Sequence, residues 1–137
     1  MMGIFSAMDI SSSGLFAQRV RLDVIANNIA NANTTRTPEG GPYRRQEVIF
    51  STRSGGFDPT DAGVHVEAVT ESRAPFKQVY DPSHPDAGPD GTVSFPNVNI
   101  VEEMVDLITA TRAYEANIAA VNAARSMVSK ALEIGRG

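Results

Sequence analysis

The sequence predicts an α+β protein in which two long terminal helices form a coiled-coil layer and flank a small β-rich middle domain. All eight prolines of the 137-residue chain lie between positions 33 and 96. Apolar residues recur at helical spacing on both sides of that segment, and short stretches within it alternate apolar with polar residues. The predicted parts are an N-terminal coiled-coil helix (1–32), an extended segment with the β-rich domain (33–96) and a C-terminal coiled-coil helix (97–137).

Two seven-residue series define the expected seam of the N-terminal helix. They are Met8, Leu15, Leu22 and Ile29, and Ile4, Ser11, Gln18, Ile25 and Ala32. Together they form the a and d positions of a heptad repeat with two polar interruptions. Residues 11–14 (SSSG) and three later asparagines each cost about 0.5–1 kcal/mol relative to alanine in a helix. We therefore expect this helix to need packing partners in order to form.

The C-terminal segment carries the more regular heptad pattern. Its series are Ile100, Leu107, Tyr114, Val121 and Val128, and Met104, Thr111, Ile118, Arg125 and Leu132. Spacings of three and four sustained over several heptads are typical of a coiled coil. Asn99 is the expected N-cap, Glu102 is placed to complete a capping box, and Asn97 is a competing cap.

The middle segment predicts short strands and one surface loop. Apolar and polar residues alternate at 45–50 and 64–69, and shorter candidate strands lie at 76–80 and 92–95. The loop at 80–91 is rich in proline and glycine, so we expect it to run over the surface.

The length of the helices implies contact with other chains. A helix of about 30 residues is about 45 Å long, whereas a compact globule of this size has a radius of gyration of about 14 Å. Even if the two helices pair, their outward faces still carry Phe5, Phe16, Val105 and Ile108. Other chains are the expected cover for those side chains.

Composition excludes several classes of function. Hydrophobic residues make up 42% of the chain and charged residues 20%, which is typical of a folded domain. The net charge of −4 makes nucleic acid a poor candidate partner. The chain has no cysteine, hence no thiolate metal site. It also lacks the ~18-residue apolar run of a transmembrane helix and the pattern of a cleaved signal peptide.

No catalytic, cofactor-binding or metal-binding residues are predicted, and no small-molecule substrate. His84 lies near three aspartates, at positions 81, 86 and 90, but their spacing fits neither a calcium loop nor a zinc site. A solvated loop is therefore the favoured interpretation. The serines at 11–13 lack a G-x-S-x-G elbow, and no phosphate-binding loop is present. We expect the protein not to be an enzyme.

Three strings resemble those of a known family. ANNIANANT (26–34) resembles the N-terminal signature shared by flagellar rod, hook and hook-associated proteins. TRTPEGGPYRRQ (35–46) is similar to a proximal-rod member of that family. So is YDPSHPDAGPDGTVSFPNVNIVEEMVDLITATRAYEANIAAVNAARSM (80–127). The strings cover most of the chain and occur in the expected order.

The resemblance implies a structural subunit of the bacterial flagellar basal body. Such proteins are exported by the flagellar type III apparatus without a cleaved signal, and polymerise into a helical tube across the periplasm. Their terminal helices form the inner, D0-like layer, and the tube transmits motor torque and forms part of the export channel. Implied partners are other copies of the chain, neighbouring rod proteins, and the adjoining base and ring proteins. The alternative is a soluble coiled-coil adaptor or scaffold.

We predict that the subunit interface draws on the two seams and on the asparagines of the signature. The residues are Met8, Leu15, Leu22, Ile25, Asn27, Asn28, Ile29, Asn31, Met104, Leu107, Tyr114, Ile118, Val121, Val128 and Leu132. The asparagines have two interpretations: turn-forming side chains at a frayed helix end, or amide hydrogen bonds to neighbouring subunits that fix register. Tyr114 is either ordinary core or an interface anchor, and we favour the anchor.

Overall fold

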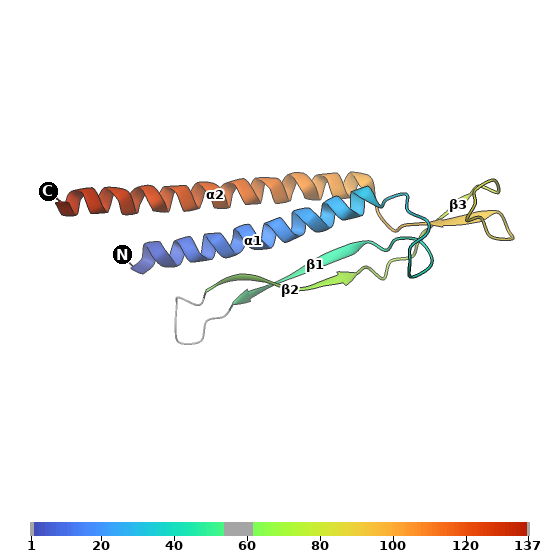
Figure 1. The fold of residues 1–137 in the computed structure, drawn as a ribbon, viewed down its shortest axis with the longest axis horizontal. Coiled ribbons are helices and arrows are strands. Elements are labelled where there is room, and N and C mark those ends of the chain that lie inside the picture. Colours follow the sequence, from blue (N-terminus) through green and yellow to red (C-terminus); the bar gives the residue numbers. More distant parts are fainter. Residues whose placement is uncertain (1, 54–61, 137) are drawn as a thin grey trace.

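The computed structural model describes residues 2–53 and 62–136, and shows an elongated molecule with both termini at one end (Figure 1). Its elements are α1 (Met2–Ala30), β1 (Gln46–Arg53), β2 (Gly63–Glu71), β3 (Lys77–Tyr80), β4 (Thr92–Phe95) and α2 (Ile100–Arg136). Two long helices and a strand-rich middle confirm the predicted α+β class. Neither helix, over the residues described, contains a stretch apolar enough to cross a membrane.

The helices α1 and α2 lie side by side and antiparallel (Figure 1). Two contacts define their register: Asn28 bonds to Glu103, and a Cβ placed on Gly14 would lie 2.9 Å from the side-chain nitrogen of Asn117. The closest packing uses small residues, because Ala17, on α1, and Ala110, on α2, are almost completely buried. Small side chains allow this close approach of the two backbones.

One predicted series of α2 is not the one that the subunit buries. Glu103, Ala110 and Ala124 are buried, whereas Met104 is 50% exposed and Leu132 is 57% exposed. The buried series is therefore displaced by one residue from the predicted one. The physical reason is the close approach of the helices: Gly14 leaves space for the Asn117 side chain, and the alanines at 17 and 110 are small enough to be buried between the backbones. In the other predicted series, the residues at 107, 114, 121 and 128 are half-buried, as expected for a contact face, whereas Ile100 at the start of the helix is 39% exposed.

The start of α2 confirms one of the two predicted caps. The side-chain oxygen of Asn99 accepts hydrogen bonds from the backbone N–H groups of Val101 (3.1 Å) and Glu102 (3.4 Å). Asn99 is thus the N-cap. The side chain of Asn97 binds elsewhere: its oxygen accepts a 2.8 Å hydrogen bond from the backbone N–H of Arg45.

The middle segment forms two separate antiparallel ribbons where the sequence suggested one β unit. The ribbon β1–β2 has a bulge between Ile49 and Phe50 and lies along α1, while β3–β4 extends beyond the ends of the helices where α1 stops and α2 begins (Figure 1). The four strands lie close to their predicted positions. Their division into two ribbons follows from α1, which offers β1–β2 a surface to pack on.

Residues 11–14, which weaken the isolated helix, are docking points in the folded subunit. The Ser13 hydroxyl oxygen accepts a 3.1 Å bond from the backbone N–H of Val64, and it donates to the Ile10 carbonyl (2.7 Å). A Cβ on Gly63 would lie 2.8 Å from the same oxygen, and Gly63 has a φ of +154°. The serine therefore holds the start of β2, and the adjacent Gly14 admits α2.

Gly14→Leu should destabilise the subunit by about 1–3 kcal/mol, the range for overpacking a close contact. Leucine is a good helix former, so the loss would come from separating α1 and α2 at Asn117. The matched control is Gly3→Leu, because nothing lies within 4 Å of a Cβ at that position. Thermal unfolding followed by circular dichroism measures both variants. Equal melting temperatures for the two would contradict the close packing.

Candidate assembly surfaces and the polar junction

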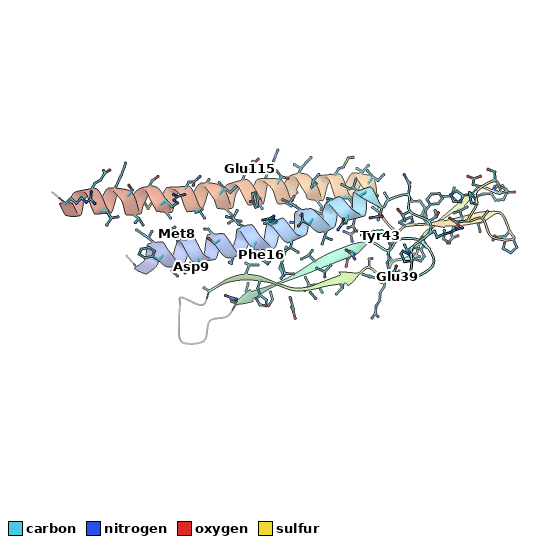
Figure 2. The ribbon with its side chains drawn as sticks, viewed as in Figure 1. Met8, Asp9, Phe16, Glu39, Tyr43 and Glu115 are labelled. Carbon is cyan, nitrogen blue, oxygen red and sulfur yellow. The ribbon has the colours of Figure 1, made fainter. Side chains whose placement is uncertain are left out.

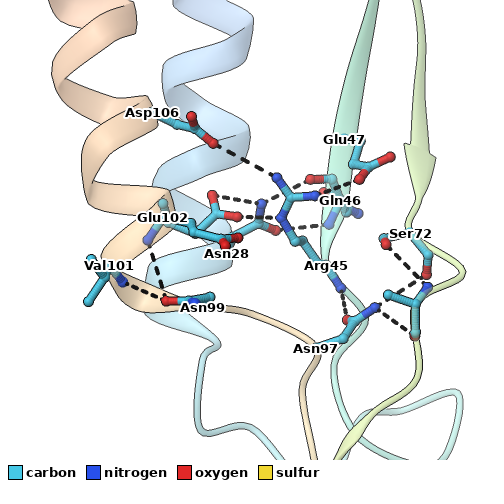
Figure 3. A network of polar contacts seen from close by, with 12 residues as sticks. Asn28, Arg45, Gln46, Glu47, Ser72, Asn97, Asn99, Val101, Glu102 and Asp106 are labelled. Carbon is cyan, nitrogen blue, oxygen red and sulfur yellow. Dashed lines mark hydrogen bonds and ion pairs between the residues drawn. The ribbon is translucent and has the colours of Figure 1, made fainter.

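Asn28 lies at the centre of a buried polar junction (Figure 3). Its side chain is 1% exposed and uses all of its hydrogen-bonding capacity inside the subunit. The oxygen accepts bonds from the Tyr43 hydroxyl (2.8 Å) and the Gln46 backbone N–H (2.9 Å). The nitrogen donates to the Gln46 carbonyl (2.9 Å) and to a Glu103 oxygen (3.3 Å). Asn28 thus pairs with Gln46 as a neighbouring strand would.

The junction also holds a buried carboxylate. Glu103, in the first turns of α2, is fully buried and forms an ion pair with the Arg45 guanidinium. Arg45 also pairs with Glu47 and lies 3.9 Å from an Asp106 oxygen. Burial opposes the charge of Arg45, but the hydrogen bonds and charges of Glu103 and Glu47 outweigh it and raise the pKa of Arg45. The guanidinium is therefore charged at any physiological pH.

Tyr43 completes this arrangement as a hydrogen-bond donor. Burial, together with the charges of Glu103 and Glu71, raises the pKa of the Tyr43 hydroxyl above its ordinary value. The hydroxyl therefore keeps the proton that it donates to Asn28. The junction joins the end of α1, the start of β1 and the first turn of α2, so its chemistry is that of a structural clamp.

Sequence patterns alone did not predict this clamp. The Asn28 amide was expected at a frayed helix end or against neighbouring subunits, and no buried partner was predicted for Glu103. The detectable signal was the seven-residue series of residues 103, 110, 117, 124 and 131, where a glutamate and an asparagine interrupt three alanines. A charged residue on a contact series requires a buried partner, and the arginines near position 45 were available.

The other two asparagines of the predicted set, Asn27 and Asn31, lie at the C-terminal end of α1. Asn31 donates from its side chain to the Asn27 carbonyl (2.9 Å) and accepts from the Thr34 hydroxyl (3.1 Å). Asn31 therefore closes the last turn of α1, in line with the turn-forming interpretation. Asn27 is exposed.

The remaining predicted interface residues fall into two groups. Those between the elements of the subunit are Ile25, which is buried, and Met8, Leu15, Leu22, Ile29, Leu107, Tyr114, Val121 and Val128, which are half-buried. Exposed residues form the second group: Met104, Ile118 and Leu132. The structure thus places part of the predicted set inside the subunit and leaves the rest accessible to other chains.

Both helices carry further exposed apolar side chains. Phe5 and Phe16 of α1 are 52% and 63% exposed, and Val105 and Ile108 of α2 are more than half exposed. Figure 2 shows Glu115 on the side of α2 that faces away from α1, which marks the free side of this helix. Apolar residues repeated along a free helix face mark an interaction surface.

The loop at 80–91 is tied to the segment that follows α1. The Asp86 carboxylate accepts a 2.7 Å bond from the Thr35 hydroxyl and pairs with Arg36. His84 accepts a bond from the Asp86 backbone N–H (3.0 Å) and packs edge-on against Phe95. Within residues 2–53 and 62–136, no three His, Asp or Glu side chains gather in a metal-binding cluster.

This tie should weaken in acid. Hydrogen bonds from Thr35 and Arg36 lower the pKa of Asp86 below its ordinary value. A carboxyl whose pKa is lower in the folded state contributes stability above its unfolded pKa, about 3.9, and loses it as the pH falls through the folded pKa. An NMR titration of the Arg36 guanidinium should show release below about pH 4. The same acid transition in Asp86→Asn would contradict this assignment.

These features define a class of protein: an elongated structural subunit with a clamped junction and long helices whose outer faces are apolar. The model of the family "Flagella basal body rod protein" matches residues 8–36, and that of "Flagellar basal body rod FlgEFG protein C-terminal" matches residues 90–134. The two matches cover most of α1 and of α2.

Full-length relatives identify the particular family. The chain is 49% identical to the flagellar basal-body rod protein FlgC of Borreliella burgdorferi, over 99% of this chain and 100% of that protein. It is 43% identical to the proteins of the same name from Bacillus subtilis and Salmonella typhimurium, each over 98% of this chain and 100% of the relative. The chain belongs to the FlgC family of flagellar basal-body rod proteins. It is a structural subunit of the rod, which confirms the resemblance.

Proposed function

We propose that the chain polymerises, with its own copies and neighbouring rod proteins, into a helical tube that crosses the periplasm. The tube transmits torque from the motor and encloses part of the export channel. The observation that carries this proposal is the row of exposed apolar side chains along both helices, which a free subunit would leave in water. The adjoining base and ring proteins are further partners in this proposal.

In this proposal the subunit works without catalysis and without a cofactor, and it leaves the cytoplasm with its N-terminus uncleaved. The relatives are named as flagellar basal-body rod proteins. The soluble adaptor is the alternative. Full-length similarity to rod proteins and the apolar outer faces of both helices favour the rod.

Fractionation of flagellated cells that carry an epitope-tagged copy tests the proposal. We expect the tagged chain in purified basal bodies, with the N-terminal sequence of the translated protein, and absent from them when the flagellar export apparatus is disabled. A chain that stays in the cytosolic fraction of flagellated cells would contradict the rod and support the adaptor.

A further inference from the structure

The exposed side of α1 carries a regular pattern of apolar and charged residues. The α1 outer face consists of Phe5, Asp9, Ser12, Phe16 and Arg19, all exposed, at successive spacings of four, three, four and three. This spacing keeps the five side chains on one stripe of the helix. The stripe lies away from Ala17, Val24 and Asn28, which are buried in the subunit.

The exposed side of α2 carries the complementary pattern. The α2 outer face consists of Glu102, Val105, Thr109, Arg112 and Ala116, all exposed, at spacings of three, four, three and four. Read from residue 116 back to residue 102, the spacings are four, three, four and three. This is the order of the α1 outer face read forwards, so the two faces match when the helices run antiparallel.

In that antiparallel register the charges are also complementary. Asp9 lies opposite Arg112, and Arg19 lies opposite Glu102. Asp9 and Arg19 are ten residues apart on α1, and Glu102 and Arg112 are ten residues apart on α2. Each spacing corresponds to about 15 Å along the helix axis. No ion pair engages these four side chains within the described part of the subunit. Their charges are therefore available to another chain.

The register also places each bulky side chain opposite an apolar or small one. Phe16 lies opposite Val105, and Phe5 lies opposite Ala116, where a small residue leaves room for an aromatic ring. Phe5, Phe16 and Val105 are each more than half exposed in the single subunit. Burying two phenylalanines per contact is the main source of binding energy, and the charges fix the register.

We propose that the α1 outer face of one subunit binds the α2 outer face of a second copy in this antiparallel register. This inference rests on the proposed function and specifies which surfaces meet. Copies that stand side by side with the same polarity present α1 antiparallel to the neighbour's α2. Because the two faces differ, the contact is heterologous and leaves a free face at each end of any row. Such a contact extends from copy to copy, as a subunit of a helical polymer requires.

Disulfide cross-linking tests the register, and the chain suits it because it contains no cysteine. The test variant carries Phe5→Cys and Ala116→Cys. The matched control carries Phe5→Cys and Ala123→Cys, which lies on the same exposed side of α2 but about 10 Å farther along. Basal bodies are purified from cells in which each variant replaces the normal chain, and are then oxidised.

We expect the test variant to give a ladder of dimers, trimers and larger species, and the control to give at least about tenfold less. Dimers alone would indicate a closed two-fold pair and overturn the open row. A ladder only in the control would overturn the register. Basal bodies that contain the chain without cross-links would overturn the pairing while the proposed function stands. If both the variant chain and the unsubstituted chain were absent from basal bodies, the result would contradict both the pairing and the proposed function.

Charge reversal provides a second test that does not depend on cysteine. Arg112→Glu places two acids together at Asp9, so we expect the amount of the chain in basal bodies to fall about tenfold. Adding Asp9→Arg should restore it to within about twofold. Asp23→Arg, on the same side of α1 but beyond the register, should not restore it. Equal rescue by both second substitutions would overturn the pairing of Asp9 with Arg112.

Discussion

Arg45→Met is expected to lower the free energy of unfolding of the subunit by about 3–5 kcal/mol, the range for removing one partner of a buried ion pair. Methionine keeps most of the volume of the arginine stem but removes the charge. The Glu103 carboxylate would then remain fully buried beside Asn28 without its cation. Urea unfolding of the purified chain measures the loss as a fall in the midpoint.

Two controls separate the clamp from a general loss of charge. Arg36→Met removes the surface partner of Asp86 and should leave the urea midpoint nearly unchanged, because an exposed pair contributes little. The double variant Arg45→Met with Glu103→Leu should recover much of the stability, because no uncompensated charge remains. A single Arg45→Met variant as stable as the unsubstituted chain would show that the junction is not a clamp.

Ile118→Asp is expected to abolish assembly. Ile118 is 38% exposed in the single subunit, so a carboxylate there can stay hydrated in the monomer. Against the apolar surface of a neighbouring chain the same carboxylate would cost several kcal/mol, and the cost would recur at every subunit of the polymer. Soft-agar motility should be lost although the variant chain is made and exported.

The control for this substitution is Ser83→Asp, which places the same new charge on an exposed position of the loop at 80–91. Motility of these cells should be close to normal. Export of both variants is measured separately by immunoblotting of cell fractions. Normal swimming with Ile118→Asp and lost swimming with Ser83→Asp would place the assembly surface on the loop.

Local sequence patterns predicted the elements of this fold because those patterns reflect local physics. Proline confined to 33–96 separates helix from strand, and Asn99 satisfies the free N–H groups at the start of α2. Alternation placed the strands close to their observed positions, from β1 at Gln46 to β4 at Phe95. Each of these signals requires only neighbours in the chain.

The arrangement of the elements was not predictable in the same way. The clamp joins Asn28 and Arg45 to Glu103, across 75 and 58 positions of sequence, and no local pattern reports such a pairing. On α2, apolar residues occur on two sides of the helix, so hydrophobicity alone favoured Met104 and Ile118 over Ala110 and the buried Glu103. The close contact at Gly14 determines which side faces α1.

In the proposed rod, the exposed apolar side chains of α1 and α2, Ile118 among them, make the contacts between subunits. Electron microscopy of basal bodies from cells whose only copy of this chain carries Ile118→Asp tests this proposal most directly. We expect basal bodies in which the rod is interrupted where this subunit is added, while the unsubstituted chain gives complete rods. Complete rods that contain the Ile118→Asp chain would contradict it.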